Sequence, residues 1–70
     1  MPDYIRVIDE KRNQIGMTIR ALARKAGMDD DLLGKTFHGK RKMTASELIA
    51  LSYALGLSLD DYPIQTQKAV

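Results

Sequence analysis

Two groups of charged side chains in the middle of the sequence could act on a charged partner. Three carboxylates are consecutive over Asp29–Asp31, and three cations are consecutive over Lys40–Lys42, with Lys35 and His38 between them. Cationic side chains hold phosphate groups, whereas a carboxylate can accept a hydrogen bond from the amino group of cytosine. Carboxylates at the start of a helix could also cap it and complement its dipole. We favour this second interpretation for Asp29–Asp31, and it is compatible with a hydrogen bond from cytosine.

The remaining residues do not favour catalysis. The chain has no cysteine and one histidine, and its sequence supports no nucleophile-base pair, carboxylate pair or cluster of metal ligands. A chain of 70 residues also buries too little surface to shield a substrate from water. We therefore predict that the protein is not an enzyme and uses no metal or other cofactor.

The hydropathy pattern is that of a globular protein. The 44% of hydrophobic residues contain no apolar run long enough to span a membrane. The N-terminal residues lack the basic stretch and apolar core of a secretory signal. These features predict a cytoplasmic protein with no membrane partner.

The charge is distributed unevenly along the chain. Residues 11–42 carry nine basic and three acidic side chains, a net charge of +6, and the other residues have a net charge of −4. A basic middle segment could form a face that binds nucleic acid, since neutralised phosphates supply most non-specific affinity. Scattered Lys and Arg could equally solvate helix surfaces, and charge alone does not decide between these interpretations.

Glycines and capping residues divide the chain into segments of helical length. We expect one helix to begin after Asp3 and stop at Gly16, and a second, very short helix to follow the cap Thr18 and end at Gly27. A third helix should follow the cap Asp29 and run to about residue 38, before Gly39.

The second half of the chain contains the clearest helix signal. Thr44 and Glu47 form a capping box, and apolar residues follow at helical spacing up to Gly56. A last turn begins at Ser58 and is interrupted by Pro63. The expected fold is all-α, with five short helices and no strand in a domain over residues 1–63, followed by a flexible tail over 64–70.

The two middle helices have the length and the glycine turn of a helix-turn-helix. The run Met17–Lys42 resembles the phage Cro/repressor family, also called the XRE type, and the similarity continues through Glu47–Asp61. It covers roughly residues 5–62. The resemblance implies a lambda-repressor-like DNA-binding domain, a five-helix bundle whose third helix enters the DNA major groove. Double-stranded DNA would be the partner, with a homodimer possible.

The resemblance also implies which residues contact DNA. The base-facing residues would be Asp30, Asp31 and Lys35, and Lys35 could reach the two major-groove acceptors of guanine or a phosphate. The phosphate-binding residues would be Thr18, Arg20, His38, Lys40, Arg41 and Lys42. The implied function is that of a sequence-specific transcriptional regulator, a small Cro-like repressor of phage or mobile-element type.

Several residues depart from the family pattern. Three carboxylates replace the usual polar or basic tip of the recognition helix, and repulsion from phosphate is expected there. Ile19 and Leu32 replace frequent polar residues. Phe37 replaces a common Glu, so Arg12 must pair with Asp9, Glu47 or a phosphate instead. These departures support an alternative in which the fold is reused for protein-protein contact, through a patch formed by Ile19, Leu32 and the carboxylates.

Two further features allow more than one interpretation. Gly34 lies inside the third helix, where Gly is about 1 kcal/mol less favourable than Ala, which suggests close approach of another helix or of a DNA backbone. Helix packing is the interpretation we favour. Ile49 and Tyr53 lie four residues apart in the fourth helix and would either extend the core or form a dimer contact.

Overall fold

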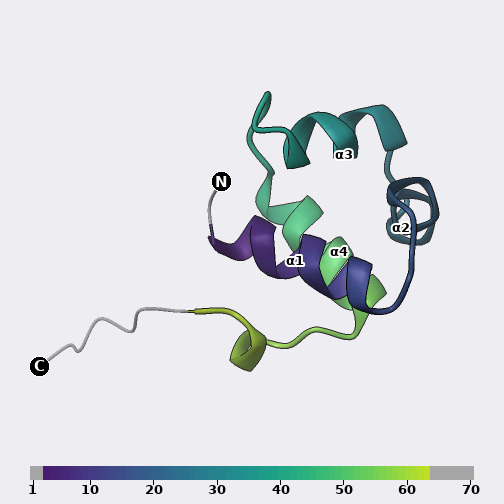
Figure 1. The fold of residues 1–70 in the computed structure, drawn as a ribbon. Helices are drawn as coiled ribbons and strands as arrows, with labels where there is room; N and C mark the ends of the chain where they lie inside the picture. The colour runs from purple at the N-terminus through teal and green to yellow at the C-terminus, as the bar shows by residue number, and fades with distance from the viewer. Residues whose placement is uncertain (1–2, 64–70) are drawn as a thin grey trace, which may run out of the picture.

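The protein is described here by a computed structural model that covers residues 3–63. Within this range the chain forms four α-helices, a short 3-10 turn and no strand (Figure 1). The elements are α1 (Asp3–Gln14), α2 (Ile19–Ala26), α3 (Asp30–Phe37), α4 (Ala45–Leu55) and η1 (Leu59–Asp61). The all-α prediction is confirmed. Residues 64–70, expected to form a flexible tail, lie outside the described range.

The prediction of a fifth helix is wrong. The segment after α4 forms the three-residue turn η1, in which the backbone N–H of Ser58 donates to the Asp61 carboxylate at 2.8 Å. Tyr62 then adopts an extended conformation, with φ −102° and ψ 146°. Tyr62 precedes Pro63, and a residue before proline is disfavoured in the helical region, so the helix cannot continue.

The other helix boundaries follow from capping. Thr18 accepts a hydrogen bond from the Ala21 N–H at 3.0 Å at the start of α2. The predicted capping box of α4 is present: Glu47 N–H donates to Thr44 Oγ1, and Thr44 N–H donates to Glu47 Oε1. Side-chain oxygens thereby satisfy N–H groups that the helices themselves leave without partners.

The core lies where the four helices meet. Helix α2 packs against α3 and α4, and α1 packs against the same two helices. Ile8, Leu22, Leu33 and Leu51 supply one fully buried side chain from each helix. Burial of these side chains, at about 1.5–3 kcal/mol each, orients the helices and leaves the opposite face of α3 exposed. Across the described residues, we find no helix that is long and apolar enough to cross a lipid bilayer.

Candidate nucleic-acid interface

Helices α2 and α3 form a helix-turn-helix (Figure 1). The turn contains Gly27 in the left-handed conformation, with φ 75°, and its N–H donates to the Arg24 carbonyl at 3.2 Å. Asp29 then caps α3 by accepting from the Asp31 N–H at 2.8 Å. A left-handed residue followed two positions later by a new helix cap turns the chain sharply, so α3 is held against α2 in a defined orientation.

Helix α3 has one buried and one outward face. Leu33, Thr36 and Phe37 are buried. The outward stripe consists of Asp31, Gly34, Lys35 and His38, which follow one another at helical spacing. Together with Asp30 and Lys40, this stripe lines a shallow hollow of about 410 Å³. The structure therefore brings the three predicted base-facing residues and two of the predicted phosphate-binding residues to one surface.

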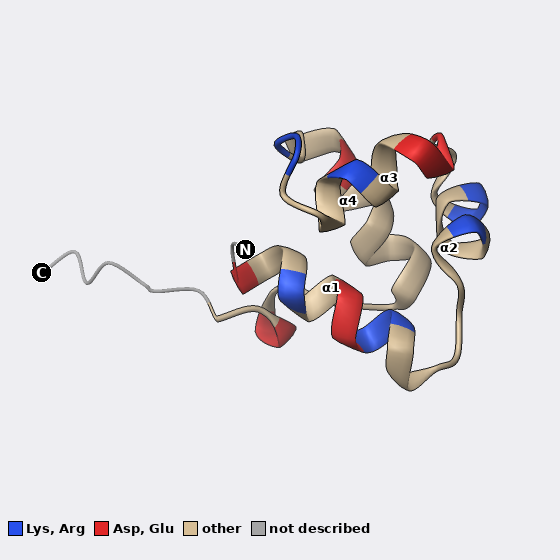
Figure 2. Ribbon diagram, turned by 45° about the horizontal axis from the view of Figure 1, so that its top comes forward, with Lys and Arg blue, Asp and Glu red and all other residues tan. Residues whose placement is uncertain are grey.

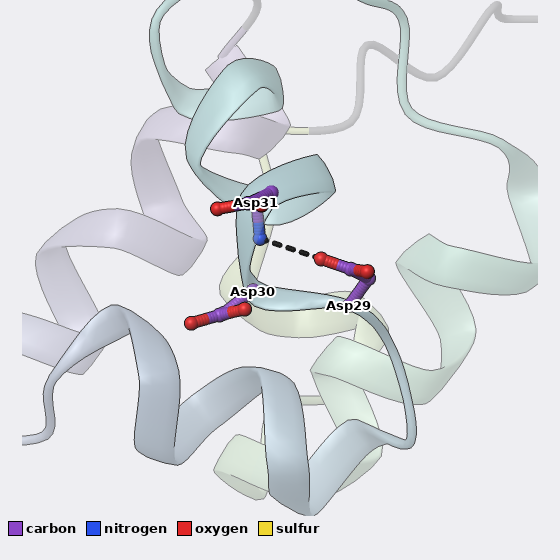
Figure 3. A group of neighbouring side chains, drawn as sticks. All are labelled: Asp29, Asp30 and Asp31. Atoms are coloured by element: carbon purple, nitrogen blue, oxygen red, sulfur yellow. Dashed lines mark hydrogen bonds between the residues drawn. The ribbon is translucent and has the colours of Figure 1, made fainter.

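The three carboxylates at the start of α3 lie close together, with oxygen atoms within 4.8 Å of one another (Figure 3). Asp29 is engaged in the helix cap. Asp30 lies 4.0 Å from Arg20 Nε across the α2–α3 junction, and both side chains are exposed. This spacing is short enough for one cation, but two of the carboxylates already have protein partners. Asp29 makes the helix cap that the sequence favoured, and Asp30 makes a charge pair with Arg20 that the sequence did not predict.

The basic segment after α3 divides into two kinds of side chain. Lys40 and Lys42 are exposed. Arg41 is instead bound within the protein, with Nη1 donating to Thr36 Oγ1 at 2.8 Å and to Glu47 Oε1 at 3.0 Å, and with Nη2 donating to Glu47 Oε2 at 3.1 Å. Its side chain is 24% exposed. Arg41 therefore joins the loop to α3 and α4.

The ion pair of Arg41 and Glu47 was missed from the sequence. Glu47 was recognised as a capping residue, and the six-residue separation between the two residues corresponds to no helical pairing rule. The hydrogen bonds from Arg41 are the main cause that lowers the pKa of Glu47 below its ordinary value of 4.5, and the backbone hydrogen bond from Thr44 lowers it further. The carboxylate is thus held in its charged form.

Arg12 uses one of the three partners expected for it. Its Nη2 and Nε donate to Asp9 Oδ1 at 2.7 and 3.0 Å, and its Nη1 donates to the Met17 carbonyl at 2.8 Å. Its guanidinium carbon lies 5.9 Å from the centre of the Phe37 ring. Arg12 therefore makes a cation-π contact with the Phe37 ring in addition to its ion pair with Asp9.

The remaining predicted phosphate-binding residues lie on α2 and at the end of α3. Thr18 and Arg20 are exposed at the start of α2. His38 is exposed, and its Nδ1 lies 2.7 Å from the Gly34 carbonyl. A carbonyl only accepts hydrogen bonds, so Nδ1 carries a proton in this contact. Figure 2 shows basic residues of α2 near the acidic start of α3 and a basic segment after its other end.

A comparison with protein-family models decides the family. The model described as "Helix-turn-helix" matches residues 8–62. The chain belongs to the XRE-type helix-turn-helix family. Neither a search of curated proteins nor a search of solved structures finds a match. The resemblance inferred from the sequence is confirmed over almost the full range expected for it.

The structure of this helix-turn-helix protein excludes one of the two interpretations given for Gly34 and one of the two given for Ile49 and Tyr53. Helix packing does not explain Gly34, because a Cβ atom built on it would meet no atom within 4 Å. Ile49 and Tyr53 do not extend the core, because they are 69% and 88% exposed. Both residues lie on the outside of α4, so of the two roles expected for them the dimer contact remains as a proposal.

Proposed function

We propose that this helix-turn-helix protein is a sequence-specific DNA-binding transcriptional regulator of the small, Cro-like repressor kind, acting in the cytoplasm by occupying an operator. The observation that carries the proposal is the outward stripe of α3 together with the basic side chains that lie beside its two ends. Arg20 lies beside Asp30 at its start, and Lys40 lines the same hollow as His38 at its end. A helix presented in this way fits the major groove, and cations at its ends would meet the flanking phosphates.

In this proposal α3 reads the bases. Lys35 would donate to O6 and N7 of guanine, and Asp30 or Asp31 would accept from the amino group of cytosine. Asp29 is engaged by the Asp31 N–H, so it contributes to the cap and not to base contact. Partial neutralisation of Asp30 by Arg20 reduces the repulsion between the acidic tip and DNA.

The phosphate contacts fix the position of the protein on the duplex. Thr18 and the backbone N–H groups at the start of α2 would bind one phosphate, assisted by Arg20. His38, Lys40 and Lys42 would bind phosphates at the other end of α3. Arg41 supports these contacts by holding the loop against Glu47 and Thr36, and its own contact with a phosphate would compete with that ion pair.

We further propose that two copies bind one operator. Helix α3 has eight residues and is only about 12 Å long, enough for one short half-site. A groove of about 570 Å³, lined mostly by apolar residues of α4 and the segment after it, contains the exposed side chains of Ile49, Tyr53 and Leu59. Figure 1 shows α3 and η1 at opposite ends of the bundle. A second copy seated on this groove would leave both α3 helices free for half-sites about 34–36 Å apart.

The test is a titration of the protein against a pool of random duplexes at several salt concentrations, followed by sequencing of the bound DNA. We expect Lys35→Ala to relax base preference. Lys40→Ala and Lys42→Ala should each weaken binding to all sequences and reduce the slope of log K against log salt by about 0.9. Arg6→Ala on α1, where Arg6 pairs with Asp3, is the matched charge control. Unchanged slopes in both loop variants would refute the assignment.

The alternative of a protein-protein interaction module predicted a patch of Ile19, Leu32 and the three carboxylates, of which the carboxylates and one of the two apolar residues are exposed. Leu32 is 39% exposed, whereas Ile19 packs against the core. Absence of binding to generic duplex DNA at low salt would favour this alternative, since the phosphate contacts proposed above are independent of sequence.

A further inference from the structure

Gly34 lies in the middle of the outward stripe, at a place where the described residues provide no reason for a glycine. It lies within α3 and is absent from the glycines with positive φ, so its backbone conformation suits any residue. A Cβ atom would point into open space. Alanine would fit this position and favour the helix. The reason for glycine therefore lies outside residues 3–63.

The surroundings of Gly34 indicate where an outside molecule would come close. Gly34 lines the shallow hollow between Asp31 on one side and Lys35 and His38 on the other. Its carbonyl already accepts from the backbone N–H of His38 at 3.0 Å and lies 2.7 Å from His38 Nδ1. With both hydrogen bonds made, this carbonyl can be covered by a partner without losing a contact to water.

We propose that Gly34 is the point of closest approach between α3 and the base-pair edges in the major groove, an inference that rests on the function proposed above. The absence of a side chain lets the backbone of α3 descend to van der Waals contact with the groove floor. This depth matters most for Asp31. An aspartate carboxylate is only one bond beyond Cβ, so it reaches a cytosine amino group only when the backbone is close, whereas the longer Lys35 tolerates a greater distance.

The proposal predicts opposite effects of one substitution on stability and on binding. Gly34→Ala should raise the melting temperature by about 4–8 °C, because alanine favours the helix and meets no neighbour. The same variant should bind the selected duplex about tenfold more weakly, and Gly34→Gln should bind more weakly still, because each added atom lifts the helix from the groove floor. The loss should be largest at the base pair opposite Asp31.

The experiment measures melting temperature and affinity for the duplex selected by the wild-type protein. Asn13→Ala, an exposed position in the last turn of α1, is the control for helix stabilisation away from α3. It should stabilise the protein and leave affinity unchanged. Wild-type affinity in Gly34→Ala, or a lower melting temperature in that variant, would overturn the inference. Failure of the wild-type protein to bind any duplex would instead overturn the proposed function, so the two failures are distinct.

Discussion

Both oxygens of the Glu47 carboxylate accept hydrogen bonds from Arg41, at 3.0 and 3.1 Å, and the two side chains are largely buried. The pair connects the loop after α3 with the first turn of α4. The same carboxylate accepts from the Thr44 N–H in the capping box. One acidic side chain therefore serves both the start of a helix and the position of the proposed phosphate-binding loop.

Removal of Arg41 should destabilise the fold. We expect Arg41→Ala to lower the free energy of unfolding by about 1–3 kcal/mol, because it removes charge-assisted hydrogen bonds to Glu47 and Thr36. The neighbouring Lys40→Ala, at an exposed position, should change it by less than about 0.5 kcal/mol. Urea denaturation of both variants measures the difference. Equal stability of the two variants would contradict the role of Arg41 in holding the loop.

The same pair predicts a pH dependence of stability. The pKa of Glu47 is lowered in the folded state, chiefly by Arg41, from an ordinary value of 4.5. The stabilisation is therefore present above this value and is lost as pH falls through the lower folded-state pKa. Melting temperatures of wild type and Glu47→Gln, a variant that can keep the capping box, should differ above pH 4.5 and converge in more acidic solution. A constant difference across that range would contradict this assignment.

The contact between Arg20 and Asp30 should influence DNA binding more than stability. Both side chains are exposed, and an exposed pair of this kind contributes little to folding. Arg20→Ala should weaken binding to all duplexes, and adding Asp30→Asn should recover part of the loss, since the unpaired carboxylate no longer repels the phosphates. A double-mutant cycle by fluorescence anisotropy at low salt gives the coupling. Additive effects would show that the two residues act independently.

The contacts of Arg12 with Asp9, the Met17 carbonyl and the Phe37 ring should make arginine hard to replace at this position. Arg12→Lys keeps the charge but loses the planar group that contacts Asp9, the Met17 carbonyl and the ring. We expect a loss of about 1–2 kcal/mol in the free energy of unfolding. Lys11→Arg, in the same helical turn, provides a control for exchange of the two basic residue types. A wild-type denaturation midpoint for Arg12→Lys would be inconsistent with the contact.

The apolar groove on α4 predicts a specific effect of charge on assembly. Ile49→Asp should leave the melting temperature of dilute protein almost unchanged, because Ile49 is 69% exposed. It should weaken self-association and remove cooperative binding to paired half-sites. Sedimentation velocity and titrations of one and two half-sites measure these effects, with Ser46→Asp at the exposed start of α4 as a control. If wild type and Ile49→Asp sediment alike at all concentrations, the groove is not a dimer contact.

The fold was largely predictable because short-range signals determine most of it. Thr18, Thr44 and Glu47 make the caps expected of them, and Gly27 adopts the left-handed turn conformation. The expected fifth helix is only the three-residue turn η1, because the segment between Ser58 and Pro63 is too short for a helix once Tyr62 is extended. Such local rules act between neighbours in the sequence, which is why they can be read without a structure.

The candidate site was less predictable because it depends on pairings between separate elements. Nothing in the spacing of Arg41 and Glu47, or of Arg20 and Asp30, indicates that they meet. The space around Gly34 is likewise a property of the assembled helices. The sequence predicted which charges would lie near α3, but the structure was needed to separate those that stabilise the protein from those that are free to contact a partner.

The hydroxyl group of Tyr62 forms a hydrogen bond with Ser52 of α4, and Pro63 after it is exposed. This bond anchors the last described turn to the bundle, on the side away from α3 (Figure 1). A fluorophore or an affinity tag joined after Pro63 should therefore leave α3 uncovered, but it would lie beside the groove proposed as the dimer contact. A truncation before Tyr62 would remove the hydrogen bond that holds the turn η1 against α4, so shortened versions of the protein should keep that residue.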